Sequence, residues 1–300
     1  MRKHFLPRRL LMALTLFIKL LSMAQLRGDS RPSISDENLQ PTKLYFVRHG
    51  ETHRNKVGEK ISGQEDGPAA QLNETGRKQA DQLGKKLAEL YSGKIAVIYT
   101  SPLGRSRETA QIIAGYFSNI DIVEDPRLME FNHGKYDTMD FKLRNQICQM
   151  QYEAIEEETA KTGEILDRFF KWRLRLSDLI AYDSKMTEIP LEGIPETALE
   201  VLARVNLVLQ EITHSYPGKI VLLVTHAGII KTIGIEAESR QRADTKPIPM
   251  YFEATPGFTV LPGNCSITYF EKTPNTPLSF HGSEDLMRPG SKPPCSNQKF

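Results

Sequence analysis

Apolar runs and amphipathic stretches alternate along the middle of the chain. Residues 42–47 and 94–100 are short, apolar and rich in β-branched and aromatic residues, a pattern that predicts buried strands. Residues 73–91, between them, repeat apolar residues at helical spacing, and residues 105–117 predict a second helix. A third strand is expected at residues 120–123. This order predicts an α/β fold whose mostly parallel sheet has helices on both faces.

The second half of the chain has a charged helical segment, a strong strand and a polar end. Residues 139–180 have a helical pattern, and residues 195–215 predict a further helix with a proline in its first turn. Residues 220–224 are uniformly apolar and predict a buried strand. Residues 266–271 alternate and predict an edge strand. Residues 274–300, rich in Pro, Ser and Asn, are expected to be disordered because they cannot bury a core.

The chain begins with a segment typical of protein targeting. Residues 1–24 combine basic residues, an apolar run and small residues, which predicts a secretory signal peptide or, if uncleaved, a membrane anchor. The absence of acidic residues before Asp29 is also typical of an organellar transit peptide. We therefore expect export to a periplasmic, secreted or organellar location, and membrane contact only through this segment. Residues 25–41 are expected to link it to a domain at residues 42–273.

Composition narrows the classes of function. The 39 Lys and Arg are nearly balanced by 37 Asp and Glu, so the chain lacks the basic surplus typical of nucleic-acid-binding proteins, and we expect no nucleic-acid partner. Cys148, Cys265 and Cys295 lie far apart and have no metal-ligand spacing. Because their number is odd, they cannot all pair, and buried thiols are favoured over one disulfide bridge.

Polar and charged residues stand where four of the predicted strands end. The four segments are 47–52, 100–105, 128–130 and 224–228. Since ligands bind at the carboxyl ends of the strands in open α/β sheets, we expect these segments to share one pocket. Together they supply two histidines, two arginines and one glutamate: His49, His226, Arg48, Arg105 and Glu130.

This set of side chains is suited to the transfer of a phosphoryl group. Two guanidiniums can bind a phosphate dianion and neutralise its charge, so that no metal ion is needed. One neutral imidazole can attack phosphorus and a second can donate to the phosphoryl oxygens, while a protonated carboxyl group can donate to the leaving alcohol. Gly50 and Gly228, which closely follow the histidines, are expected to let the backbone approach a ligand closely.

The segments resemble the motifs of the histidine phosphatase superfamily, which includes phosphoglycerate mutases, fructose-2,6-bisphosphatases and broad-specificity phosphatases. The matching residues are Arg48-His49-Gly50, Asn55, Gly63-Gln64, Asp66, Leu72 to Ala80, Ser101 to Arg105, Leu128 to Glu130 and Thr225 to Gly228. These motifs stand in family order and the resemblance spans residues 43–272. The chain departs from the family at Asn73, where Thr is common, and after Gly134, where the usual Glu-Gly is absent.

The resemblance implies a phosphoglycerate mutase-like fold and a site that works without a metal ion or another cofactor. His49 matches the phosphorylated nucleophile and Glu130 the proton donor. Arg48, Arg105 and His226 match the other catalytic groups, which contact the phosphoryl group. The residues expected to bind substrate are Arg48, Thr52, Asn55, Arg105, His226 and Ala227.

An insertion at residues 137–192 is expected to form a helical cap beside this site. Its aromatic–basic stretch, residues 169–173, is typical of a packed helical face with solvated charges. Its position between Glu130 and His226 supports a second interpretation, in which the stretch covers the pocket and selects the substrate.

The leading functional hypothesis is hydrolysis of a phosphomonoester through a phosphohistidine at His49. Phosphoglycerate mutase activity is the first alternative, but residues 131–133 supply little that could bind a substrate carboxylate. A non-catalytic phosphate-binding scaffold is the second, and the complete set of reactive side chains argues against it. The expected partner is a phosphorylated small molecule, with a phosphoprotein as the other substrate class.

Overall fold

The computed structural model describes residues 40–57, 62–133, 137, 196, 198–241 and 263–286. The predicted targeting segment, most of the linker, the cap apart from residue 137, and two cysteines, Cys148 and Cys295, lie outside these residues. Within the described residues, no helix combines the length and the apolar character needed to cross a membrane.

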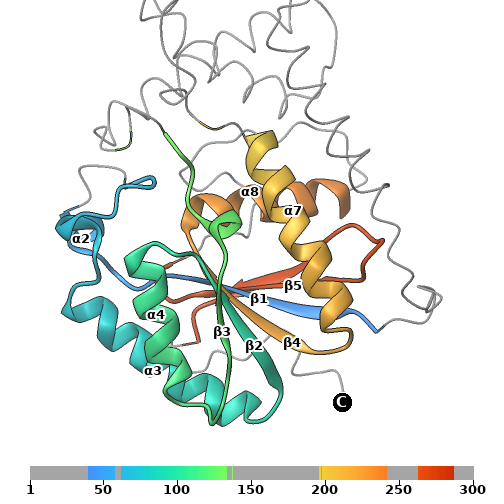
Figure 1. Ribbon diagram of the computed structural model, residues 1–300, viewed down its shortest axis with the longest axis horizontal. Coiled ribbons are helices and arrows are strands. Elements are labelled where there is room, and N and C mark those ends of the chain that lie inside the picture. The colour runs from blue at the N-terminus through green and yellow to red at the C-terminus, as the bar shows by residue number, and fades with distance from the viewer. Residues whose placement is uncertain are drawn as a thin grey trace, which may run out of the picture. The chain divides into compact units, whose positions relative to one another are not determined.

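A six-stranded sheet forms the centre of the described fold, in the order β3-β2-β4-β1-β5-β6 (Figure 1). The strands are β1 Thr42–Arg48, β2 Ile95–Thr100, β3 Ile122–Glu124, β4 Ile220–Thr225, β5 Ile267–Lys272 and β6 Ser279–Glu284. The pairs formed among β1 to β4 are parallel, whereas β5 is antiparallel to both β1 and β6. The prediction of a mostly parallel sheet is therefore confirmed.

The last two strands of the sheet, β5 and β6, correct two predictions. Strand β5 is not an edge strand, because β6 pairs with its outer side. Strand β6 itself lies inside residues 274–300, which were predicted to be disordered, and that prediction is wrong for residues 279–284. The strand is mostly polar, so composition does not reveal it. It is held by its pairing with β5 and by Leu278 and Leu286, which are buried on opposite faces of the sheet.

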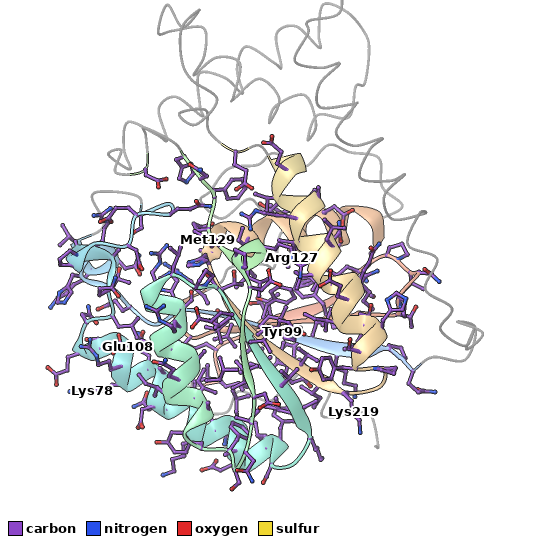
Figure 2. The ribbon with its side chains drawn as sticks, viewed as in Figure 1. Lys78, Tyr99, Glu108, Arg127, Met129 and Lys219 are labelled. Carbon is purple, nitrogen blue, oxygen red and sulfur yellow. The ribbon has the colours of Figure 1, made fainter. Side chains whose placement is uncertain are left out.

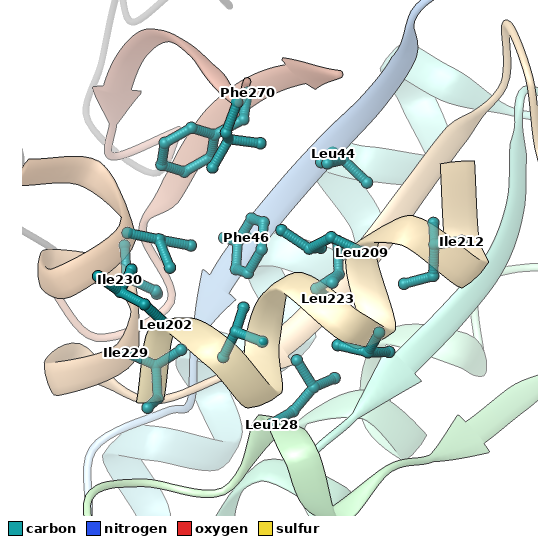
Figure 3. Packing of buried hydrophobic residues seen from close by; sticks show 14 of the residues in the cluster. Leu44, Phe46, Leu128, Leu202, Leu209, Ile212, Leu223, Ile229, Ile230 and Phe270 are labelled. Atoms are coloured by element: carbon teal, nitrogen blue, oxygen red, sulfur yellow. The ribbon is translucent and has the colours of Figure 1, made fainter. Parts of the chain in front are cut away.

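Helices cover both faces of the sheet, as predicted. The α-helices are α2 His53–Val57, α3 Glu74–Tyr91, α4 Gly104–Ala114, α7 Ala198–Ser215 and α8 Ala227–Gln241, and short 3-10 helices span Pro68–Ala70 and Pro126–Leu128. In β1, Tyr45 and Val47 face the core formed with α3 and α4, whereas Leu44 and Phe46 face the core formed with α7 and α8. Figure 3 shows the second core, in which Phe46 and Leu223 lie among Leu202, Leu209, Ile212, Ile229, Ile230 and Phe270. The apolar pattern does not predict α8, because its apolar residues are spread around the helix.

The parallel register brings the ends of three strands to one level. Arg48, the last residue of β1, pairs with Thr225, the last residue of β4. The backbone N–H of His49 donates to the Thr225 carbonyl at 3.0 Å, and the N–H of Ser101 donates to the Val224 carbonyl at 3.0 Å. The segments that follow β1, β2 and β4 therefore begin side by side, at one edge of the sheet.

The loop after β1 is clamped against the first turn of α3. Asn73 caps this helix by accepting from Gly76 N at 2.8 Å, and its side chain donates to the Glu51 carboxylate at 2.7 Å. A Cβ atom added to Gly50 would lie 2.4 Å from Gly76 O, and one added to Gly76 would lie 2.1 Å from Glu51 O. The missing side chain of Gly50 therefore admits the backbone of a helix, a role that the sequence did not predict, and the expected close approach of Gly50 to a ligand stays a prediction.

We predict that Gly76→Ala destabilises the protein, although Gly→Ala normally stabilises a helix interior. The added Cβ collides with backbone, which cannot rotate away, and we expect the free energy of unfolding to fall by about 1–3 kcal/mol. Urea unfolding of Gly76→Ala and of Lys85→Ala, an exposed position on the same helix, measures this difference. Lys85→Ala should stay within about 0.5 kcal/mol of the wild type. A stabilised Gly76→Ala variant would show that the contact between Gly76 and the loop after β1 leaves room for a Cβ atom.

Candidate active site

His49 lies directly after β1 and is held as a neutral imidazole. Its Nδ1 lies 2.8 Å from the Gly50 carbonyl oxygen, which can only accept, so Nδ1 carries the proton and Nε2 is left with a lone pair. The side chain is buried, and this burial, together with the positive charges of Arg105 and Arg48, holds the pKa of His49 well below its usual range. An imidazole in this state is a nucleophile at Nε2.

His226 follows β4, and its ring centroid lies 5.3 Å from that of His49. Two hydroxyl groups converge on its Nε2, from Ser101 at 2.8 Å and from Ser106 at 3.3 Å. Because hydroxyl groups can donate to this nitrogen, the arrangement is compatible with the tautomer that carries its proton on Nδ1. Nδ1 is buried and has no hydrogen-bond partner among the described residues. Burial first, and then the charge of Arg105, hold the pKa of His226 well below its usual range.

Arg105 lies in the first turn of α4 and is almost fully buried. Its guanidinium donates to the carbonyl oxygens of Glu65 at 3.1 Å and Gly63 at 2.7 Å. The Asp66 carboxylate accepts from Gly104 N at 2.9 Å and thereby holds the start of the helix. Burial lowers the pKa of Arg105 and the nearby Glu130 raises it, and the guanidinium keeps its positive charge.

Arg48 ends β1 beside His49, and its pKa is subject to the same two opposing effects as that of Arg105. Burial lowers the pKa of Arg48, and Glu130 opposes this shift. The Glu130 carboxyl group is therefore within electrostatic reach of both arginines. The structure thus brings together the five predicted catalytic side chains, from segments that are far apart in the chain.

Glu130 is joined to the first turn of α8 by its carboxylate. Oε1 accepts from Phe131 N at 3.0 Å, and Oε2 accepts from Gly228 N at 3.0 Å. A Cβ atom on Gly228 would lie 2.3 Å from Glu130 Oε1. The missing side chain of Gly228 thus leaves space for the Glu130 carboxyl group, a role that the sequence did not predict, and the expected close approach of this backbone to a ligand stays a prediction. The free N–H groups of a helix N-terminus are suited to hold a carboxylate.

Asn55 and Thr52 bond to each other across the start of α2. Thr52 Oγ1 accepts from Asn55 N at 3.0 Å, and Asn55 Oδ1 accepts from Thr52 N at 3.3 Å, which is a reciprocal helix cap. The Thr52 side chain is fully buried and serves this cap. Asn55 has its amide oxygen engaged, so its Nδ2 is the atom oriented to donate elsewhere. Substrate binding by Thr52, Asn55 and Ala227, the first residue of α8, stays a prediction.

The sequence motifs did not reveal the positioning contacts of two residues, Asn264 and Ser101. Asn264 Nδ2 donates to the His49 carbonyl at 3.0 Å and to Asn55 Oδ1 at 3.3 Å, and so ties the His49 segment to Asn55, which is predicted to bind substrate. Ser101 lies inside a recognised motif, but its position gives no hint that its hydroxyl contacts His226. No local signal identifies Asn264, because it lies 215 residues from His49 in the chain.

Cys265 lies beside the site without the features of a reactive thiol. It is free and buried, and burial raises its pKa to about 12. Its backbone N–H donates to the Arg48 carbonyl at 3.0 Å, so its contact with the site is through the main chain. Across the described ranges no group of three or more His, Cys, Asp or Glu side chains is arranged to hold a metal ion, and metal independence stays a prediction.

Comparisons with known proteins find related sequences and a shared fold. A sequence model of the histidine phosphatase superfamily (branch 1) matches residues 44–171 and 172–261. Phosphoglycerate mutase-like protein 4 of Arabidopsis thaliana is 27% identical over 197 residues, which are 66% of this chain and 71% of that protein. A metal-independent phosphoserine phosphatase of the same plant is 27% identical over 192 residues, 64% of this chain and 67% of the relative. The phosphoglycerate mutase of Bacillus anthracis shares the fold, with a TM-score of 0.56 at 20% identity over 81% of this chain and 93% of that one.

We predict that the ligand-free protein loses stability as the pH falls below about 6.5, the usual pKa of histidine. Because the pKa values of His49 and His226 are lowered in the folded state, the unfolded chain takes up protons that the folded chain does not. Each histidine should contribute up to about 1.4 kcal/mol of lost stability per pH unit. Urea unfolding between about pH 5 and pH 7.5 measures the slope. His226→Asn should reduce it, and an unchanged slope would contradict the burial of a neutral His226.

Proposed function

Because the chain belongs to the histidine phosphatase superfamily, we propose that it hydrolyses phosphomonoesters without a metal ion, through a phosphohistidine at His49. The observation that carries this proposal is the 2.8 Å contact between His49 Nδ1 and the Gly50 carbonyl oxygen, which in the neutral ring places the proton on Nδ1 and leaves the lone pair on Nε2. A nucleophile in this state, buried next to two arginines, needs no separate base to activate it.

In the first proposed step, His49 Nε2 attacks phosphorus and the bond to the leaving oxygen breaks. Arg48 and Arg105 neutralise the charge of the phosphoryl oxygens. His226 adds a donor through its Nδ1–H, in the tautomer whose Nε2 accepts from the serine hydroxyls. Glu130 gives a proton to the departing alcohol. The products of this step are the free alcohol and a phosphohistidine.

In the second step, water attacks the phosphohistidine and releases inorganic phosphate. Glu130, now a carboxylate, takes a proton from the water as its oxygen bonds to phosphorus. The bond between phosphorus and Nε2 breaks, and its electron pair returns to the His49 ring. The enzyme is thus restored without a metal ion or a second substrate.

Two features support hydrolysis over mutase activity. The residues after Glu130 present a stacked aromatic pair, Phe131 and His133, with ring centroids 5.9 Å apart. Arg54, which lies in α2, is engaged in a 2.8 Å ion pair with Glu65. A phosphoglycerate mutase needs cations that hold a substrate carboxylate. The relative named as a metal-independent phosphoserine phosphatase agrees with this proposal, and phosphoserine is one candidate among small phosphate esters.

We predict that the full chain hydrolyses p-nitrophenyl phosphate in excess EDTA and that His49→Ala lowers kcat by at least about 1000-fold. The loss follows from removal of the atom that receives the phosphoryl group. His214→Ala is the matched control, because His214 is an exposed histidine on α7. It should retain the wild-type rate. Equal turnover by wild type and His49→Ala would contradict the proposal.

We further predict a covalent intermediate that rapid quenching can trap. A ³²P-labelled ester should leave label on the wild-type protein that is stable to alkali and lost in acid, as expected for a phosphoramidate. His49→Ala should carry no such label. Transfer of the label to an added phosphoglycerate, in place of release as phosphate, would favour a mutase. Binding of vanadate without any labelling or turnover would favour a scaffold.

A further inference from the structure

The backbone of the segment that carries Glu130 is held by the guanidinium of Arg204, a residue of α7. Arg204 donates through Nη2 to the Glu130 carbonyl at 3.3 Å and through Nη1 to the Arg127 carbonyl. Figure 2 labels Arg127 and Met129 in this segment, which runs beside α7. A single side chain therefore bridges the two ends of the short segment 127–130. Gln64 donates to the same Glu130 carbonyl at 2.9 Å.

A carboxylate fixes Arg204 in this position. Glu196 accepts from Arg204 Nε at 2.6 Å and from Nη2 at 2.9 Å, a two-point contact between planar groups. Glu196 also bonds to the residue that follows Phe131, because its N–H donates to the Asn132 carbonyl at 2.6 Å and its Oε2 accepts from Asn132 N at 3.3 Å. Both charged side chains are largely withdrawn from water, with exposed fractions of 17% and 15%.

The guanidinium of Arg204 makes its hydrogen bonds to the protein backbone and to Glu196. Nε and both terminal nitrogens of its guanidinium donate to these acceptors. Its charge nevertheless lies close enough to the site to contribute to the lowered pKa of His226. Arg127, in the same segment, directs its own guanidinium to Asp125 and Glu211.

We propose that Arg204, oriented by Glu196, is a positioning residue that holds the Glu130 carboxyl group where it can donate to the leaving alcohol. This inference rests on the proposed function. The Glu130 carboxylate is bound by the N–H groups of Phe131 and Gly228, and Phe131 belongs to the backbone that Arg204 and Glu196 fix. Release of this backbone moves the proton donor, and a displacement of about 1 Å costs on the order of 100-fold in rate.

The leaving group provides a test that a general structural defect would not pass. p-Nitrophenolate is a stable anion and departs without a proton, whereas the alkoxide of β-glycerophosphate needs one from Glu130. The quantity to measure is kcat/KM, because it covers the steps up to departure of the alcohol. Arg204→Gln should lower kcat/KM for β-glycerophosphate by about 10- to 100-fold and for p-nitrophenyl phosphate by less than about threefold.

Three further variants complete the experiment. Glu130→Gln should show the same dependence on leaving group, more strongly. Glu196→Gln should show it more weakly, and it tests the proposal even if Arg204→Gln fails to fold. Arg127→Gln is the matched control, since it removes a guanidinium from the same segment while the carbonyl that Arg204 contacts remains. It should leave the ratio of the two kcat/KM values unchanged.

The outcomes separate the positioning role from the proposed function. Equal losses on both substrates in Arg204→Gln and Glu196→Gln would assign the ion pair to stability alone and overturn the inference. Wild-type kcat/KM values on both substrates in both variants would overturn it as well. If the wild-type chain hydrolyses neither ester, the proposed function itself is contradicted, and the positioning role with it.

Discussion

The parallel pairing of β1 with β4 is the constraint on which the rest of the site depends. Arg48 and Thr225 end their strands opposite each other, so His49 and His226 leave the sheet at the same level, on neighbouring strands. Strand β2 pairs with the other side of β4 and brings Ser101 and Arg105 to the same edge. A shift of one residue in this register would turn side chains to the opposite face and disperse the site.

Burial and positive charge then determine the chemistry of the site. Burial and the nearby arginines both disfavour protonation of His49 and His226, so both imidazoles are held neutral. The same positive charges attract a dianion, and the nearby Glu130 carboxyl group raises the pKa of both arginines. A phosphate group and a neutral nucleophile are thus favoured by one electrostatic arrangement. A positively charged histidine would bind phosphate too, but it would have no lone pair with which to attack.

Precise placement in this site comes largely from backbone contacts. Gly76 packs against the loop that carries His49, Asn264 bonds to the His49 carbonyl, and the carbonyl of Glu130 is held by Arg204. None of these contacts is made to the reactive atoms themselves. They fix the main chain on both sides of the site, and a side chain is oriented only as well as the backbone that bears it.

The sequence by itself determined the order of the first strands and helices, the mostly parallel sheet, and the five candidate catalytic side chains, because periodicity and strand-end motifs are local patterns. It did not reveal β6, whose polar residues become a strand only through pairing with β5. It did not show that the missing side chain of Gly228 makes room for Glu130, which folding brings there from a distant segment. The contacts of Asn264 and Arg204 join residues 215 and 74 positions apart. Only tertiary structure decided these contacts, since they depend on how the helices pack on the sheet. No local pattern of residues encodes a contact between positions so far apart in the chain.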